Sequence, residues 1–289
     1  MSALATVGDN TIDEYVGEDS GTFVGGNALN VAVQLRRLGH DVSYAGAVGR
    51  DAAGERIRSA LDGLGVDLGG LVVLDGATSV SRIRVRPDGD RVIELEDFAV
   101  CADYRPTEED LDQLATHAFV HLGWTPYATE IRRALRARGA RLSQDCAISA
   151  GYEHLDVAFC SAGDDLETAR TMAEQAVDGG ARLAVVTCGP AGSLAFDGRT
   201  WWRQGADPVV VVDTTGAGDS FIAGFLGAYA DVDGEGDDEG DEVAVALRAG
   251  AATAARTCGH RGGWPQEARG VLEMDPQAGD HGKDRTHAF

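Results

Sequence analysis

The segment PVVVVDTTGAGDSFIAGFLGAYA, from Pro208 to Ala230, decides the predicted fold of this chain. It begins with a run of β-branched residues, which is typical of a buried strand, and continues into a glycine-rich turn. After the turn, Ser220–Ala230 carries no charge and is rich in glycine and alanine, which permit close packing of a helix. A strand, a turn and a helix in this order predict one unit of a parallel sheet covered by helices.

The turn of this segment has the features of an anion site. The backbone N–H groups of Gly216, Ala217 and Gly218 can converge on one point, where the positive end of the helix dipole favours phosphate. Asp219 has two interpretations: an N-cap residue, or the base that deprotonates an acceptor hydroxyl in phosphoryl transfer. These residues alone support the two interpretations about equally. The uncharged helix predicts that Asp219 has backbone amides and substrate as its neighbours.

The composition limits the kinds of partner. The chain has 289 residues, of which 44% are hydrophobic, enough for a large buried core, and a formal net charge of -22. Such a charge excludes nucleic acid as a partner, because it repels phosphate. No apolar run is long enough to span a bilayer, and the N-terminus lacks the basic and apolar parts of a secretion signal. We therefore expect a cytoplasmic protein that binds no membrane.

The kind of charge is also informative. Lysine is almost absent, with Lys283 as the single example, while acidic residues are spread along the chain. This pattern favours a halophilic protein, because concentrated salt shortens the range of electrostatic self-repulsion. The alternative is an ordinary acidic protein from a genome rich in G and C. The acidic, glycine-rich segment 231–242 is predicted to be a solvated loop.

Most of the remaining sequence alternates strand-like and helix-like segments, which predicts a mainly parallel sheet with helices on both faces. Residues 79–100 differ, because polar and apolar residues alternate around the turn signal PDGD. This pattern predicts an antiparallel hairpin with one solvated face. The hairpin is either a lid over the carboxyl edge of the sheet or an edge hairpin without a role.

The sequence GGNALN is a candidate site for a polyhydroxy ligand. Gly25 and Gly26 allow the backbone to approach a ligand closely, while Asn27 and Asn30 lie on one face of the first turn of a helix. The alternative role of these amides is local capping. Asp9, just after the first predicted strand, is placed to accept hydrogen bonds from hydroxyl groups.

A third candidate site follows the buried strand in VTCGPAGSLAFD. Its loop contains Thr187, Gly189 and Gly192, small residues that suit the phosphates or ribose of a nucleotide, although a plain turn has the same composition. No GxxxxGK[ST] motif is present, which excludes a lysine-cradled P-loop enzyme.

Taken together, these motifs resemble the PfkB, or ribokinase-like, family of carbohydrate kinases, from Leu4 to about Trp264. The most specific elements are GGN, continuing to AGAVGRDAAGERI, and DTTGAGDSFIAGFL. The resemblance implies an α/β, three-layer βαβ sandwich with a small β-sheet lid. The lid is expected at about 11–23 and 79–100 of a kinase domain over 1–265, followed by an irregular tail at 266–289, and the family often dimerises through this lid.

The resemblance also implies roles for single residues. Asp219 resembles the catalytic base, and the amides of Gly216, Ala217 and Gly218 the anion hole. The implied sugar contacts are Asp9, Gly26, Asn27 and Asn30, and the implied nucleotide loop contains Thr187, Gly189 and Gly192.

Cofactors implied by the resemblance are ATP and Mg²⁺, with K⁺ in some members. Asp213 and Thr215 match positions that hold the monovalent cation. The family's Asn-x-x-Glu motif, which organises magnesium and phosphate, falls at Ser161 and Asp164, so both positions depart from the usual pattern. The departure affects how the metal is held rather than the class of enzyme.

Within the family, the stretches GDNTIDEY, GGNALNVAV and GAATAARTCGHRGGW most resemble those of kinases that act on a fructoselysine-like ketosugar, and this resemblance implies such a substrate. An ammonium-bearing substrate would require acidic contacts such as Glu94, Glu96 or Asp97, which are otherwise solvated surface. The alternatives are a ribokinase, a 2-keto-3-deoxygluconate kinase or a nucleoside kinase, and, from another class, a non-catalytic sugar or nucleotide sensor.

Overall fold

The computed structural model of the chain describes residues 3–17, 20–86, 91–230 and 239–270. Its main feature is a 9-stranded sheet, parallel except for two antiparallel pairings at one edge. In order across the sheet, the strands are β13 (Trp201–Gln204), β12 (Ser193–Phe196), β11 (Leu183–Thr187), β10 (Val157–Ser161), β9 (Leu142–Asp145), β8 (Phe119–Leu122), β1 (Ala3–Val7), β4 (Asp41–Gly49) and β5 (Asp67–Leu74).

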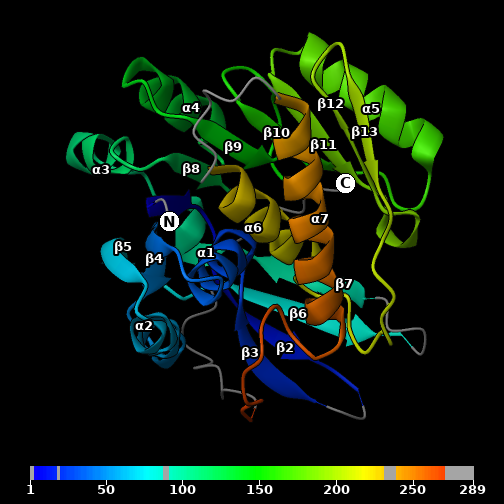
Figure 1. Cartoon of the computed structure of the whole chain (residues 1–289). Coiled ribbons are helices and arrows are strands. Elements are labelled where there is room, and N and C mark those ends of the chain that lie inside the picture. Colours follow the sequence, from blue (N-terminus) through cyan, green and yellow to red (C-terminus); the bar gives the residue numbers. More distant parts are fainter. Residues whose placement is uncertain (1–2, 18–19, 87–90, 231–238, 271–289) are drawn as a thin grey trace.

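Helices cover both faces of this sheet (Figure 1). Because side chains alternate along a strand, neighbours such as Leu4 and Ala5 of β1 enter different hydrophobic clusters, one on each face. One face carries α1 (Asn27–Arg37), α2 (Ala52–Leu64), α6 (Ala217–Ala230) and α7 (Glu239–Cys258). The other carries η1 (Ala99–Ala102), α3 (Glu108–Leu114), α4 (Ala128–Ala137) and α5 (Leu166–Asp178). The predicted three-layer α/β architecture is confirmed.

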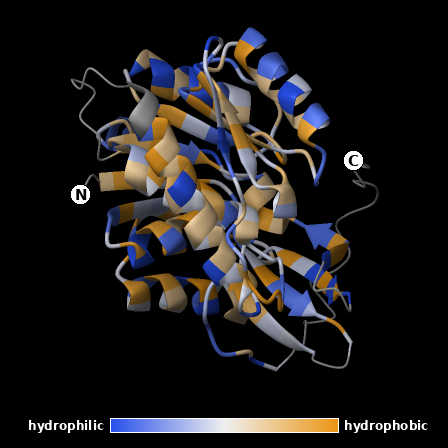
Figure 2. Cartoon of the chain, turned by 45° about the vertical axis from the view of Figure 1, so that its right-hand side comes forward, coloured by the Kyte–Doolittle hydropathy of each residue, from blue (hydrophilic) through white to orange (hydrophobic). Residues whose placement is uncertain are grey.

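Helix α6 is buried along most of its length. Its residues from Ser220 to Gly227 are all buried. In Figure 2 the ribbons at the centre of the molecule are mostly tan to orange, and blue is more common toward the rim. Gly224 allows this fit, since a Cβ there would lie 2.5 Å from the carbonyl oxygen of Ala249 in α7. The uncharged sequence of α6 therefore reflects burial between the sheet and α7.

A second, 4-stranded sheet contains the predicted hairpin. Its strands, in spatial order, are β3 (Gly21–Gly25), β2 (Thr11–Tyr15), β6 (Val80–Val85) and β7 (Arg91–Asp97). Strands β6 and β7 pair in antiparallel fashion, as the alternating sequence predicted, and the turn predicted at 87–90 lies outside the described residues. Figure 1 shows this sheet beside one end of the large sheet, and we call it the lid sheet.

The structure corrects the predicted strand at 208–212. These residues form no strand, and Val210 is 85% exposed. Only the end of the segment is held, where the N–H group of Val212 donates to the carbonyl oxygen of Cys258 at 2.8 Å. A β-branched run needs a neighbouring strand to pair with, and the chain here leaves β13 to reach the end of α7 instead.

The first residues of the predicted irregular tail are ordered against β3. The side chain of Gln266 bonds to both the N–H and the carbonyl group of Val24, and Arg269 forms a β-bridge with Thr22. The predicted acidic loop 231–242 is corrected at its end, because α7 begins at Glu239. The segments 231–238 and 271–289 lie outside the described residues, and the domain boundary at 265 stays a prediction.

Candidate active site

Polar side chains gather where the parallel strands end. Asp9 follows β1, Trp124 follows β8 and Asp145 is the last residue of β9, and these strands are neighbours in the large sheet. Their carboxyl ends meet at one edge, which is where ligands bind in open α/β sheets. The first turns of α1 and α6 reach the same place, because Asn27 of α1 contacts both Asp145 and Asp219.

Asp219 is held by two amides of α1. The side chain of Asn27 donates to one carboxylate oxygen at 2.6 Å, and that of Asn30 donates to the other at 2.8 Å. Asn27 also donates to Asp145 at 2.8 Å, so it joins the two carboxylates. The expectation that Asp219 has only backbone amides and substrate as neighbours is therefore wrong, because these carboxamides already reach it.

The amide oxygens of the same residues lack partners. The Oδ1 atoms of Asn27 and Asn30 are buried and accept no hydrogen bond within the described part of the chain. A buried acceptor without a donor is costly unless a ligand supplies one. Hydroxyl groups of a substrate are suitable donors, which supports the predicted contacts of these residues with a sugar.

Asp9 organises the backbone around this site. Its carboxylate accepts from the N–H groups of Asn27 at 2.7 Å, Ala28 at 3.2 Å and Trp124 at 3.0 Å. It therefore caps α1, whose own N-cap position, Gly26, has no capping side chain. This bonding gives Asp9 a structural role, and its predicted contact with sugar stays a prediction.

The glycine pair before α1 is required by close approach. A Cβ on Gly25 would lie 2.1 Å from the carboxylate of Asp13, and a Cβ on Gly26 would lie 2.4 Å from the Cα of Asn10. Gly26 also has a φ of 109°, which favours glycine. The pair thus lets α1 begin directly against the chain that leaves β1, with Asn27 facing the carboxylates.

Burial sets the electrostatics of the carboxylates. Desolvation raises the pKa of Asp219 to about 7, against the lowering effects of the Asn30 hydrogen bond and the charge of Arg91. The charges of Asp145 and Asp9 raise it further. Desolvation likewise raises the pKa of Asp145 to about 6. A carboxylate with a pKa near neutrality can accept and release a proton at physiological pH.

Three residues of this neighbourhood were not predicted from the sequence. Asp145 lies at a strand end as Asp9 does, and this position was its one sequence signal. Asp13 is buried on the inner side of β2, and the hydroxyl of Thr11 donates to its carboxylate at 2.6 Å. Arg91 begins β7, and its charge acts on the carboxylates of both Asp145 and Asp219. No local pattern marked Asp13 or Arg91, because their positions depend on the pairing of lid strands.

The predicted anion turn lies directly before α6, as expected, but one of its three predicted N–H donors is used within the protein. Gly216 has a φ of 73°, and a Cβ there would lie 2.4 Å from the Cα of Gly263. The N–H group of Ala217 donates to the carbonyl oxygen of Thr214 at 3.1 Å, which closes the turn. In the described residues, no protein acceptor is assigned to the N–H groups of Gly216 and Gly218. These two amides are the better candidates for an anion.

Asp213 connects this turn to the lid sheet. Its carboxylate accepts from the hydroxyl of Tyr15 at 2.6 Å, the N–H of Thr215 at 2.9 Å and the N–H of Gly262 at 2.9 Å. The Oγ1 atom of Thr215 is buried and has no partner among the described residues. The predicted cation site thus contains one oxygen without a partner, beside a carboxylate that is already bonded.

The predicted nucleotide loop and the departing Ser161 and Asp164 lie together. Ser161, at the end of β10, is the register partner of Thr187 at the end of β11. Gly192 closes the loop against β13, since a Cβ there would lie 2.1 Å from the carbonyl oxygen of Gln204. Gly189, with a φ of 47°, begins the short helix η2 (Gly189–Ala191).

Oxygen donors in this loop region could serve a metal ion. Asp164 and Ser161 are both exposed, and they offer one carboxylate and one hydroxyl. Among the described residues, no group of three or more His, Cys, Asp or Glu side chains could enclose a metal ion. The set suits Mg²⁺, which usually keeps several waters and binds few protein groups together with substrate phosphates.

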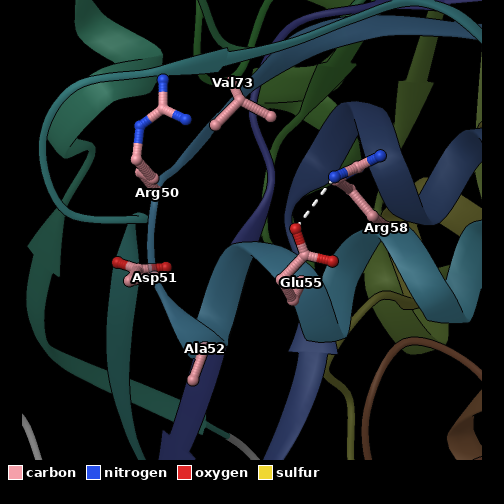
Figure 3. Close-up of a pocket in the computed structure, with 6 residues that line it drawn as sticks. All are labelled: Arg50, Asp51, Ala52, Glu55, Arg58 and Val73. Atoms are coloured by element: carbon pink, nitrogen blue, oxygen red, sulfur yellow. Dashed lines mark hydrogen bonds and ion pairs between the residues drawn. The ribbon is translucent and has the colours of Figure 1, made fainter.

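A surface hollow of about 380 Å³ lies elsewhere, at the start of α2 (Figure 3). Its polar groups bond to the protein: Glu55 pairs with Arg58 at 2.9 Å, and Arg50 with Asp75 at 3.2 Å. Asp51 caps α2 through the N–H group of Gly54 at 2.8 Å and also accepts from Thr78. We assign the site to the Asp219 cluster, because the buried amide oxygens of Asn27 and Asn30 lack partners there, within the described part of the chain, beside a glycine turn.

The covered parallel sheet, the lid sheet and a partly buried carboxylate beside a glycine turn define a ribokinase-like sugar kinase. The model of the pfkB family of carbohydrate kinases matches residues 14–267, and the chain belongs to this family. In the part of the chain that the structure describes, no helix is long and apolar enough to cross a bilayer. The predicted family, fold and carbohydrate kinase class are confirmed.

Two relatives and one solved structure illustrate the match. The chain is 36% identical to the fructoselysine 6-kinase of Escherichia coli (strain K12), covering 91% of this chain and 100% of that one. It is 31% identical to a fructosamine kinase of Bacillus subtilis (strain 168), covering 89% and 90%. The structure of Arabidopsis thaliana ribokinase complexed with ribose and ATP is similar with a TM-score of 0.77 and 23% identity, covering 89% and 92%. This last likeness concerns the fold.

Proposed function

We propose that this chain transfers the γ-phosphoryl group of ATP to a primary hydroxyl of a sugar or sugar derivative, with Asp219 as the base. One observation carries the proposal. The Asp219 carboxylate lies at the first turn of α6, is held by Asn27 and Asn30, and has its pKa raised to about 7 by burial. An N-cap residue would bond to the backbone N–H groups of its own helix, whereas the bonds of this carboxylate go to α1.

The chemical step follows from this arrangement. The acceptor hydroxyl is placed beside Asp219 and gives up its proton to that carboxylate as its oxygen forms a bond to the γ-phosphorus. The bond between this phosphorus and the β–γ bridging oxygen breaks, and ADP leaves. The N–H groups of Gly216 and Gly218, at the positive end of α6, stabilise the charge on the transferred group. Asn27 and Asn30 keep the carboxylate in place and accept from sugar hydroxyls.

The nucleotide is assigned to the loop with Thr187, Gly189 and Gly192. Asp164 and Ser161, at the end of the neighbouring strand, would hold Mg²⁺ through water or phosphate. When bound, this ion would neutralise charge on the phosphates. Asp213 and Thr215 remain the candidates for a monovalent cation such as K⁺, and the unpartnered Oγ1 atom of Thr215 supports this assignment.

A fructoselysine-like ketosugar is the favoured acceptor, on the strength of the relatives that act on fructoselysine and fructosamine. Asp13 is a further candidate for contact with the sugar, because it is buried on the inner face of the lid sheet beside Gly25, just before α1. We also propose that the lid sheet closes over the sugar and forms a homodimer interface, and that the enzyme works in the cytoplasm of a salt-adapted cell. Neither nucleic acid nor membrane is proposed as a partner.

An ATP-consumption assay over several acceptors tests the proposal. The panel contains fructoselysine, fructose, ribose, 2-keto-3-deoxygluconate and adenosine, in buffer with and without molar KCl. Turnover with a sugar, and most with fructoselysine, is expected. Activity on adenosine with none on any sugar would contradict the proposed substrate class. Binding of sugar or nucleotide without turnover on any acceptor would instead support a sensor.

A further inference from the structure

The carboxamide of Asn27 uses both of its N–H groups on carboxylates. Its nitrogen donates to Asp145 at 2.8 Å and to Asp219 at 2.6 Å. An asparagine side chain has two N–H donors, so the donor capacity of Asn27 is complete. Because the amide group is planar, the two bonds together fix its plane and the position of its oxygen. A bond to Asp219 alone would leave the amide free to turn about that bond.

The same orientation leaves the amide oxygen of Asn27 open to a ligand. This Oδ1 atom is buried and has no hydrogen-bond partner among the residues that the structure describes. Gly123, just after β8, borders it, since a Cβ there would lie 2.7 Å from the Asn27 oxygen. If the amide turned over, its oxygen would face two carboxylates, which are acceptors only when ionised. Both bonds are therefore needed to present this oxygen to a hydroxyl group.

Asp145 is held in place independently of Asn27. One of its carboxylate oxygens accepts from the N–H group of Ala147 at 2.9 Å, and its carbonyl oxygen accepts from that of Ser149 at 3.1 Å. The residue ends β9 and is only 9% exposed. The other carboxylate oxygen, which accepts from Asn27, is thus a fixed point against which the amide is set.

We propose that Asp145 is a positioning residue for phosphoryl transfer, which holds the carboxamide of Asn27 so that its nitrogen supports Asp219 and its oxygen accepts from the sugar. This inference rests on the proposed function of the Asp219 site and deepens it. Asp145 acts through Asn27 and touches neither the sugar nor the nucleotide. The acceptor proton goes to Asp219, and no proton moves to or from Asp145 in the step.

The charge of Asp145 has a second effect that does not require Asn27. Asp219 is influenced by groups from five parts of the chain, namely Asn27 and Asn30 of α1, Asp145 of β9, Asp9 after β1 and Arg91 of β7. The charges of Asp145 and Asp9 raise the pKa of Asp219, and that of Arg91 lowers it. A charge acts through space, whereas orientation of the amide requires the amide. The two effects can therefore be separated by removing Asn27.

Asp145→Asn removes the support while keeping the size of the side chain. The carboxylate accepts from the N–H groups of Ala147 and Asn27, and an amide has one oxygen for both. The backbone turn fixes the N–H of Ala147, so the new N–H groups meet those of Asn27 and the Asn27 amide turns away. At about pH 9, where Asp145 and Asp219 are ionised in wild type, kcat/KM for the sugar should fall about 10- to 100-fold.

A double-mutant cycle with Asn27→Ala tests whether Asp145 acts through the amide. The substrate is fructoselysine, or the sugar with the highest turnover in the ATP-consumption panel, at saturating ATP. Asn27→Ala should itself lower kcat/KM, and adding Asp145→Asn should then change it by less than about twofold. In this background the midpoint of the pH–rate profile should still move downward, because a like charge no longer opposes ionisation of Asp219. Asp145→Ser, which can keep the turn at Ala147 but is too short to reach Asn27, provides a second cycle.

Asp156→Asn is the matched control. This carboxylate is 7% exposed, accepts from the N–H group of Leu142 at the other end of β9 at 2.8 Å, and pairs with Arg136 at 3.2 Å. Its loss should lower the melting temperature and leave kcat/KM and the pH–rate profile unchanged.

Three results would overturn the inference: kcat/KM within about twofold of wild type in Asp145→Asn or in Asn27→Ala, equal losses from Asp145→Asn with and without Asn27, or an equal loss in Asp156→Asn. Equal losses in both backgrounds would indicate that Asp145 contacts the substrate itself or only stabilises the fold. In each case, sugar-dependent ATP turnover that is lost in Asp219→Asn would leave the proposed function intact.

Discussion

The side-chain amide of Asn30 donates a 2.8 Å hydrogen bond to the carboxylate of Asp219, and this bond opposes the desolvation that raises the pKa of Asp219 to about 7. The ionised base is the active form, so kcat/KM should rise with pH and level off above an apparent pKa near 7. Asn30→Ala removes a donor to the ionised form and should move this midpoint upward. A pH–rate profile of both proteins measures the shift.

Gln34→Ala is the control for this profile. It removes a carboxamide from the same helix whose hydrogen bonds go to Gly263 and Thr257 rather than to Asp219. Its midpoint should match that of wild type. A wild-type profile that is flat from about pH 5.5 to 8.5 would argue against a base with this pKa.

Tyr15→Phe tests the connection between lid and body. The variant loses the 2.6 Å bond to Asp213, a carboxylate with 0% exposure, and should lower the free energy of unfolding by about 1–3 kcal/mol. Urea unfolding measures the loss. Tyr104→Phe is the comparison, since that hydroxyl bonds to the carbonyl oxygen of Gly70 only at 3.4 Å. Equal losses of unfolding free energy in the two variants would show that the bond between Tyr15 and Asp213 stabilises the protein no more than the long bond of Tyr104.

Gly216→Ala tests the geometry of the anion turn. With a φ of 73° and a Cβ position 2.4 Å from the Cα of Gly263, alanine should destabilise the protein by about 2–4 kcal/mol. At Gly218 no atom lies within 4 Å of the Cβ position, so Gly218→Ala should change stability by less than about 1 kcal/mol. Thermal unfolding of the two variants measures this difference. Equal melting temperatures for Gly216→Ala and Gly218→Ala would contradict the described geometry of the turn.

Salt dependence tests the proposed halophilic character. With a net charge of -22, repulsion between carboxylates should weaken as salt screens it, so the melting temperature should rise between about 0.1 and 3 M KCl. An equal osmolality of sucrose separates screening from general exclusion of solute. A melting temperature that responds to sucrose but not to KCl would favour an ordinary acidic protein.

Local sequence patterns were sufficient to predict the two elements that carry the site, the glycine turn and the start of α1. The glycine turn before Asp219 and the helix start at Asn27 are marked by glycine and amide residues within a few positions of each other. The network between them was not predictable, because Asn27 meets Asp145 and Asp219 only after β9 has taken its place in the sheet. The hydrogen bonds of Asp9 to three separate N–H groups likewise depend on the start of α1 lying beside the residues that follow β8.

Long-range pairing explains the other differences. Residues 208–212 have high strand propensity but no neighbouring strand to pair with. Gln266 bonds to Val24 at the edge of the lid sheet, a contact that composition alone could not indicate. A bulge at Glu94 changes the face of every residue before it in β7. A one-residue shift of this kind has no signal in the alternation of polar and apolar residues, so Arg91 could not be placed from sequence.

Replacing Asp219 by asparagine tests the proposed base most directly. Burial raises the pKa of Asp219 above its ordinary value, so its ionisation destabilises the fold as pH rises through about 7, and the variant should be at least as stable as wild type at pH 8. Its turnover number with ATP and the best sugar acceptor should fall roughly 10²- to 10⁴-fold, with ATP binding retained. A folded variant with kcat within a few-fold of wild type would contradict Asp219 as the base.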